Sequence, residues 1–163
     1  MKMLKLAVAM LAANLFPLAS MALAQAPTPA DVAVIDKCLK GAEESGGFGG
    51  ECVGLVAHPC LKEAAGKNDD VAQKKVCGER ELAIWTVKMS EALKKVLPAA
   101  SKDMSKAVAD SQKTFAASRD RFCIIFDRIE PGIYPGSASY CRLRETANRT
   151  LSLIVLGVAV NEH

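Results

Sequence analysis

Six cysteines follow a leader-like N-terminus, and this combination constrains the fold of the 163-residue chain more than any other feature. The leader has a positive start at Lys2 and Lys5, an almost wholly apolar run over residues 6–18, and a small-x-small cleavage site at residues 22–24. We therefore expect residues 1–24 to be a signal peptide. Export would place the chain in an oxidising compartment, where six cysteines favour three disulfide bonds over a metal site.

An uncleaved membrane anchor is the alternative interpretation of this N-terminal segment. Its apolar run is shorter than the ~20 residues of a membrane span, and Pro17 interrupts it. We therefore expect cleavage before Gln25. The mature protein should be periplasmic or secreted, without membrane association once the leader is removed. The apolar segment 151–160 is also too short to span a bilayer, and it indicates the buried end of a helix.

The mature chain is close to electrical neutrality. Loss of the two leader lysines leaves 19 basic residues against 18 acidic ones, a net charge of +1. Such a chain has no basic field that could hold nucleic acid. Its length fits a single domain over residues 31–163, preceded by a flexible, proline-containing lead-in at residues 25–30.

Apolar periodicity predicts an all-α fold. Three stripes with spacings of three and four residues indicate three main helices, and no segment alternates with a period of two. The first helix is expected to stop near Pro98, the second to run from Ser101 as its N-cap to a stop at Pro131, and the third to be capped by Ser137. The stripes consist of Leu82, Trp85, Met89, Ala92 and Val96, then Met104, Val108, Ser111, Phe115, Ser118, Phe122, Ile125 and Ile129, and finally Leu143, Ala147, Leu151, Ile154 and Val158.

The first part of the mature chain predicts a smaller N-terminal subdomain. A short helix is expected over residues 31–44 with Asp31 as its cap, and the glycines of residues 46–50 end it. Residues 51–70 are expected to be mostly loop, with room for one helical turn. The predicted fold is therefore a disulfide-stapled antiparallel bundle of three main helices with a short bridged N-terminal subdomain.

Helix placement narrows the many possible cysteine pairings. Cys123 lies on the second long helix and Cys141 begins the third, and the proline-glycine turn between them brings these helix ends together. The other four cysteines flank a glycine turn and a polar turn, so local bridges are expected. The predicted disulfides are Cys38–Cys52, Cys60–Cys77 and Cys123–Cys141.

No metal site or catalytic constellation is expected. The chain lacks a C-x2-C pair and has only two histidines, His58 and His163. No serine lies in a G-x-S-x-G sequence, and the glycine-rich residues 46–50 lack the lysine and following helix of a phosphate loop. His58 precedes Pro59 and is expected to be a loop residue rather than a general base. We therefore predict no catalytic residue and no cofactor.

The C-terminal half carries short motifs in a fixed order. After Trp85 come Ser111-Gln112-Lys113-Thr114-Phe115, Arg119-Asp120-x-x-Cys123, Gly136-Ser137, Cys141 and Thr146-x-x-Arg149-x-x-x-Leu153. Together they resemble the LprI-like lysozyme-inhibitor family over about residues 60–153, with Cys60 and Cys77 similar to the two cysteines that open the family's domain. The resemblance implies a small secreted helical domain without enzymatic activity, which binds and inhibits lysozyme.

The chain departs from the family pattern at several positions. Phe115 stands where the family usually has tryptophan, and Thr86 and Ser90 stand in place of a usual Trp-Asp-x-x-Leu-Asn run. The stretch that holds Cys38 and Cys52 is an N-terminal addition. These departures bear on the transfer of inhibitor activity rather than on the fold.

The matched residues fall on two helix faces. Gln112, Phe115 and Arg119 share a face with Cys123 because they are spaced by three and four residues, and Thr146 and Arg149 share a face of the next helix. In a structural interpretation, Arg149 pairs with Asp120, while Gln112 and Thr146 bind backbone groups or each other. In the functional alternative, Arg119 or Arg149 reaches out to a partner. Trp85 is expected in the core.

Loops are the expected contact points for a partner, because loops on a rigid scaffold carry recognition. The candidates are residues 46–50 and the turn over residues 130–137, with Glu130, Ile133, Tyr134 and Ser137 as its contact residues. The partner is a lysozyme, or another envelope or secreted protein. Two alternatives remain: an interaction module of different specificity, and a carrier that holds a small molecule between its helices.

Overall fold

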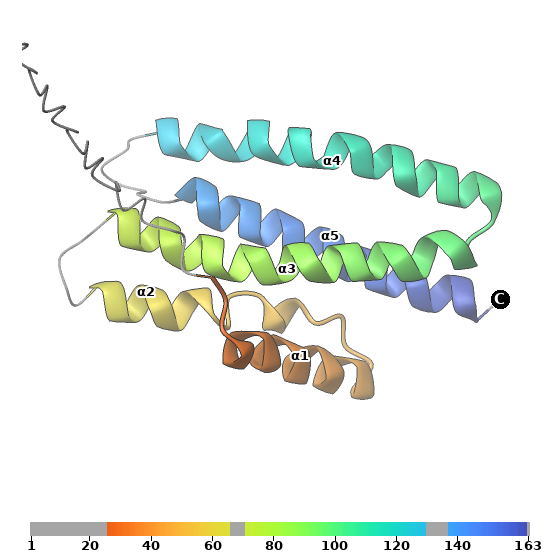
Figure 1. The fold of residues 1–163 in the computed structure, drawn as a ribbon, viewed down its shortest axis with the longest axis horizontal. Coiled ribbons are helices and arrows are strands. Elements are labelled where there is room, and N and C mark those ends of the chain that lie inside the picture. The colour runs from red at the N-terminus through yellow and green to blue at the C-terminus, as the bar shows by residue number, and fades with distance from the viewer. Residues whose placement is uncertain (1–25, 66–70, 130–136, 163) are drawn as a thin grey trace, which may run out of the picture.

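The computed structural model describes residues 26–65, 71–129 and 137–162, and within these ranges every regular element is helical. The elements are α1 (Pro29–Glu44), a 3-10 turn η1 (Gly50–Cys52), α2 (Ala57–Ala65), α3 (Val71–Ala99), α4 (Lys102–Arg128) and α5 (Ser137–Asn161). The long helices α3, α4 and α5 lie side by side in alternating directions, and α1 and α2 lie beneath α3, away from α4 (Figure 1). The predicted all-α fold with disulfides is confirmed. No described helix is both long and apolar enough to cross a membrane.

Two groups of buried side chains form the core. The larger group surrounds Trp85, which is completely buried, and joins the N-terminal elements to α3 and α5. The smaller group lies among α3, α4 and α5, where Val96 and Leu153 are its most buried members. The larger group consists of Ile35, Cys52, Val56, Ala57, Ile84, Trp85, Leu143 and Ala147. Burial of apolar side chains therefore links the N-terminal subdomain to the bundle in one structure.

All six cysteines are paired, and the pairings are the three that the sequence predicts. Cys38–Cys52 closes the glycine loop after α1, Cys60–Cys77 joins α2 to α3, and Cys123–Cys141 joins α4 to α5. The Cα–Cα distances are 5.6, 5.6 and 5.4 Å, which are ordinary for disulfides. Each bridge therefore connects two segments that follow one another in the chain.

The observed helix starts differ from the predicted ones at two places. Helix α1 is capped by Thr28, whose hydroxyl accepts from the backbone N–H of Asp31, while the Asp31 carboxylate accepts from the backbone N–H of Thr28. Asp31 is thus the third residue of a capping box and not the cap itself. Ser101 does cap α4, as predicted. Ser137 is the first residue inside α5 instead of its cap.

The region predicted to be loop is more helical than expected. Helix α2 has nine residues, and α3 begins at Val71, well before the first residue of its predicted stripe. The physical reason is tertiary, because the Cys60–Cys77 bridge holds α2 against α3. The predicted stop near Pro98 is confirmed, because α3 ends at Ala99 with Pro98 inside its last turn. One lost backbone hydrogen bond at a helix end is tolerated more easily than one in the middle.

Helix α4 is rotated relative to the predicted stripe. Val108 and Cys123 are its buried residues, whereas Phe122, Ile125 and Ile129 are 48%, 47% and 49% exposed. Fixation of Cys123 to α5 by its disulfide turns these three side chains outward. The prediction that these three side chains lie on the buried face of α4 is therefore wrong.

The predicted stripe of α5 is confirmed in its first half, where Leu143 and Ala147 are completely buried, and is wrong in its second half. Ile154 and Val158 are 39% and 49% exposed, although the sequence predicted them in the core. Thr146, Thr150 and Leu153 are buried in their place. Buried threonines need hydrogen-bond partners, and the single hydroxyl proton of Thr150 is shared between the carbonyl oxygens of Thr146 at 2.8 Å and Trp85 at 3.3 Å.

The carboxylate of Glu81 ties the N-terminal region to α3. Glu81 is fully buried, and it accepts backbone N–H bonds from Gly54, Val56 and Ala57 at 2.7, 2.9 and 2.7 Å. It also accepts a bond from the Trp85 indole nitrogen at 2.9 Å. Two of these donors lie at the N-terminus of α2, where backbone N–H groups lack intrahelical partners and favour negative charge.

Replacement of Glu81 should therefore destabilise the fold strongly. In Glu81→Gln the amide nitrogen faces backbone N–H groups, so at least one buried donor loses its acceptor, and we expect a loss of roughly 3 kcal/mol in the free energy of unfolding. Urea denaturation of the disulfide-bonded protein, followed by the fluorescence of Trp85, measures the change. Glu79→Gln is the matched control, because Glu79 lies on the same helix and pairs with the exposed Lys75 at 3.7 Å, a contact that contributes little stability. Equal stability of the two variants would contradict a central role for Glu81.

Candidate functional site

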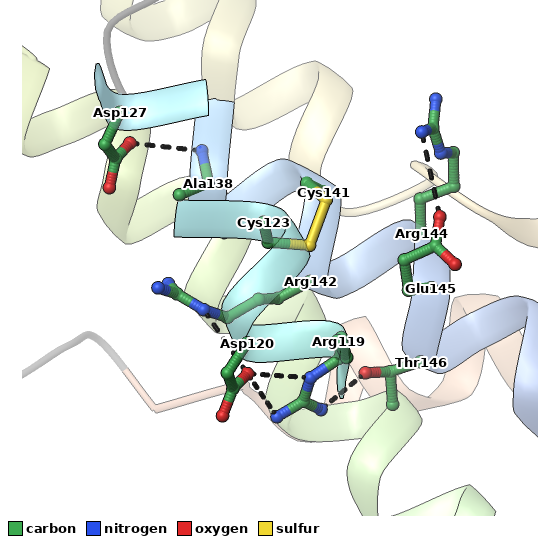
Figure 2. The surroundings of a disulfide bond; sticks show 10 residues. All are labelled: Arg119, Asp120, Cys123, Asp127, Ala138, Cys141, Arg142, Arg144, Glu145 and Thr146. Carbon is green, nitrogen blue, oxygen red and sulfur yellow. Dashed lines mark hydrogen bonds and ion pairs between the residues drawn. A yellow bond between two sulfur atoms is a disulfide. The ribbon is translucent and has the colours of Figure 1, made fainter. Parts of the chain in front are cut away.

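The Cys123–Cys141 disulfide lies near several motif residues, among them Arg119, Asp120 and Thr146 (Figure 2). Both sulfurs belong to buried residues, and the bond joins the last turns of α4 to the second turn of α5. A carboxylate oxygen of Asp127 accepts from the backbone N–H of Ala138 at 3.2 Å, so α4 supplies a hydrogen bond to the start of α5. The two predicted helix faces therefore meet.

Arg119 connects α4 to α5 through its guanidinium group. It donates to the hydroxyl oxygen of Thr146 at 2.8 Å and to a carboxylate oxygen of Asp120 at 2.9 Å (Figure 2). Arg142 approaches the same carboxylate at 3.6 Å. The Asp120 side chain is half exposed. These ion pairs therefore contribute little stability by themselves, and the bond to buried Thr146 positions Arg119.

Arg149 contacts neutral partners and not Asp120. Its guanidinium donates to the Gln112 side-chain oxygen at 3.1 Å and to the Ser111 hydroxyl at 2.9 Å. The prediction that Arg149 pairs with Asp120 is therefore wrong. The reason is geometric: Asp120 is paired with Arg119 and Arg142, whereas Ser111 and Gln112, the partners of Arg149, lie about two turns before Asp120 on α4.

Phe115 lies between the two arginines of this helix pair. The guanidinium carbons of Arg119 and Arg149 are each 5.8 Å from the centre of its ring. A cation above an aromatic face is attracted by about 0.5–1 kcal/mol at a partly exposed site. The α4–α5 seam is thus held by hydrogen bonds and cation–π contacts. Its donors can position helices or bind an anion, but they provide no nucleophile or base.

His58 and Tyr140 form a second polar contact, which the sequence did not indicate. His58 lies in the first turn of α2 and not in a loop, and its Nε2 contacts the Tyr140 hydroxyl. The rings stack with centroids 5.6 Å apart. Burial and the negative charge of Glu81 raise the pKa of Tyr140, and the charge of Arg144 opposes them. Tyr140 is therefore a neutral hydrogen-bonding group at physiological pH.

A partly open groove of about 300 Å³ lies between α1, α2 and α3. Its lining combines apolar side chains such as Val34 and Leu55 with the ion pair Arg80–Asp31, whose atoms are 2.6 Å apart. Asp31 is also held by Thr28. Arg80 and Asp31 thus satisfy each other, Glu63 adds an exposed carboxylate to the lining, and the walls are not those of a closed apolar cavity.

One cluster of possible metal ligands occurs among the described residues. The ligand atoms of Cys38, Glu51 and Cys52 lie within 4.8 Å of one another. Both sulfurs are joined in a disulfide, so neither can bind a metal as a thiolate. The single remaining carboxylate does not make a site.

The two predicted contact loops differ in what the structure describes. Residues 130–136, with Glu130, Ile133 and Tyr134, lie outside the described residues, and Ser137 begins α5. The other loop, residues 46–50, is described. It carries Phe48, whose side chain is 77% exposed. The sequence identified this loop by its glycines alone.

Comparison with known proteins identifies one family. The model of that family, described as lysozyme inhibitor LprI, matches residues 60–153. The match covers more than half of the chain and includes the described parts of α3 and α4, together with α5 up to Leu153. No curated protein and no solved structure matches the chain significantly.

Substitution of Arg149 should have a moderate effect on stability. Arg149→Ala removes two hydrogen bonds to neutral groups and one cation–π contact, and it leaves no buried unpaired charge, so we expect a loss of about 1–2 kcal/mol in the free energy of unfolding. Lys113→Ala is the control, because its ion pair with Asp110 is fully on the surface. A loss above about 4 kcal/mol, typical of a broken buried ion pair, would refute this account.

Acid should weaken the attachment of α1. Burial raises the pKa of Asp31, but the hydrogen bonds from Thr28 and Arg80 outweigh it, so the pKa lies below the ordinary value of 3.8. This stabilising effect is present above that value and is lost as the pH falls through the lowered pKa. The unfolding free energy of Asp31→Asn should therefore depend less on pH below about 4 than that of the parent protein. Arg80→Gln should remove part of the same pH dependence. If the unfolding free energies of all three proteins fall in parallel as the pH is lowered, the stabilising role of the Asp31 carboxylate is refuted.

Proposed function

The chain belongs to the lysozyme inhibitor LprI family, and from this we propose that it is an exported protein that inhibits lysozyme by forming a stoichiometric complex. The match over residues 60–153 carries this proposal. It includes the Cys60–Cys77 and Cys123–Cys141 bridges and the polar α4–α5 seam. The matched unit is therefore a rigid scaffold, as a binding protein requires.

The chemistry of the described residues supports a role in binding rather than catalysis. All six cysteines are in disulfides, so none can act as a nucleophile. The His58 ring contacts the hydroxyl of Tyr140, an arrangement that is not a nucleophile–base pair. A non-enzymatic inhibitor would block the sugar-binding cleft of lysozyme by contact alone.

The disulfides support export to the periplasm or the extracellular space. Three bridges persist in an oxidising compartment and are rare in the reducing cytosol. The segment 1–24 retains the composition of a signal peptide. Both features support export, and an exported protein could meet a lysozyme that attacks the cell envelope.

The groove between α1, α2 and α3 makes a carrier role the weaker alternative. A carrier encloses its ligand in a mostly apolar pocket. The groove is partly open, and an ion pair that is already satisfied occupies part of its wall. An interaction module for another envelope protein shares the scaffold argument and differs only in its partner.

Titration against lysozyme tests the proposed function. The purified, oxidised protein should slow the lysis of a peptidoglycan suspension by a basic lysozyme, with an end point near one inhibitor per enzyme. Inhibition should disappear after reduction and alkylation, because the unbridged chain no longer holds its loops in one arrangement. It should survive His58→Ala, because no proton transfer is involved. Absence of both a complex and any slowing at micromolar protein, against several types of lysozyme, would refute the proposal.

A further inference from the structure

We propose that the loop at residues 46–50 is a preformed docking surface on which Phe48 enters an apolar pocket of a positively charged protein. The partner is the basic lysozyme of the proposed function, on which this inference rests. The loop precedes the segment matched by the family model. It would therefore be a contact that this chain adds to the shared helical scaffold.

Phe48 is the most exposed large apolar side chain among the described residues. It is 77% exposed, and the next most exposed, Val87, reaches 58%. Exposure of this ring to water does not stabilise the isolated protein, because apolar surface is stabilised by burial. Aromatic side chains are enriched in protein interfaces, where a few of them provide most of the binding energy.

The backbone before Phe48 has one defined conformation. Helix α1 ends in a Schellman motif, in which Gly47 N–H donates to the Ala42 carbonyl at 2.7 Å and Gly46 N–H donates to the Glu43 carbonyl at 3.1 Å. Gly46 has φ = +70°, a conformation that favours glycine. The exposed ring is thus attached directly to a hydrogen-bonded helix end.

The backbone after Phe48 is fixed by packing. Gly49 has φ = +74° and is buried, and a Cβ atom at this position would lie 2.9 Å from Leu39 Cδ2 and 3.1 Å from Leu151 Cδ2. The next turn ends at Cys52, which is bonded to Cys38 of α1. The loop is therefore held at both ends while its central side chain points to solvent. Such preorganisation lowers the entropy lost on binding.

The charge near Phe48 fits a cationic partner. Glu43, Glu44 and Glu51 are exposed, and the chain has no lysine or arginine from residue 41 to residue 61. The last turn of α1 contains no basic residue, so two carboxylates lie at the negative end of the helix dipole, where they are unfavourable. The Lys40–Glu44 pair, 3.8 Å apart and exposed, compensates little. Positive charge on a partner would relieve this repulsion and steer its approach.

Substitution of Phe48 in the exported, disulfide-bonded protein tests the inference. Calorimetric titration with a basic lysozyme should show a Kd at least about tenfold higher for Phe48→Ala than for the parent protein. Its melting temperature should not change, because the side chain is exposed. Phe48→Trp should retain binding. Phe122→Ala is the matched control, because Phe122 is also exposed, at 48%, but lies on α4 beside Arg121; its Kd should stay within about twofold of the parent value.

A charge variant tests the second part of the inference. Glu43→Gln combined with Glu51→Gln should lower the association rate and weaken its dependence on salt, with Phe48 intact. If the parent inhibits lysozyme and Phe48→Ala inhibits equally well, this inference is overturned and the proposed function stands. If the parent neither binds nor inhibits lysozyme, both are overturned.

Discussion

A buried carboxylate holds the two parts of this protein together. Glu81 projects from α3 into the turn between η1 and α2, and it receives bonds from three backbone N–H groups and from the Trp85 indole. A buried charge without such donors would be very unfavourable. The bonds also determine the position of Trp85, whose backbone carbonyl accepts from Thr150 of α5. Glu81 thereby connects the N-terminal turn to α3, and Trp85 of the same helix contacts α5.

The attachment of α4 follows a different principle. α4 has two buried residues, Val108 and Cys123, so apolar burial alone would hold it weakly. The Cys123–Cys141 bridge and the hydrogen bonds of Arg119 and Arg149 fix its rotation against α5. Directional contacts specify one orientation, which a smooth apolar face would not. The consequence is an apolar stripe on α4 that points outward.

The division of the chain matches a division of roles. The segment 60–153 that defines the family forms the bundle and its polar seam. The residues before it contribute α1, the Cys38–Cys52 bridge and the loop that presents Phe48. In the proposed inhibitor, the shared bundle provides rigidity and the added loop provides a contact with the partner. A rigid scaffold with variable loops is a common arrangement in recognition proteins.

The sequence by itself determined the features that depend on near neighbours in the chain. Helical periodicity, the Ser101 cap, the burial of Trp85 and the three disulfides could be predicted because each reflects spacings of a few residues or one turn-back. The family and its extent were also readable from short motifs in order.

Only the tertiary structure decided how those helices are rotated and which polar groups meet. Nothing in the sequence distinguishes Glu81 from a glutamate on the surface, except that it lies four residues before Trp85. This spacing was the one available signal that the Glu81 carboxylate could accept from the Trp85 indole. The partners of Arg149 and the outward turn of Phe122 depend on a disulfide and on hydrogen bonds between α4 and α5. Periodicity shows that a helix has an apolar face, but contacts between residues distant in the chain decide whether that face is buried.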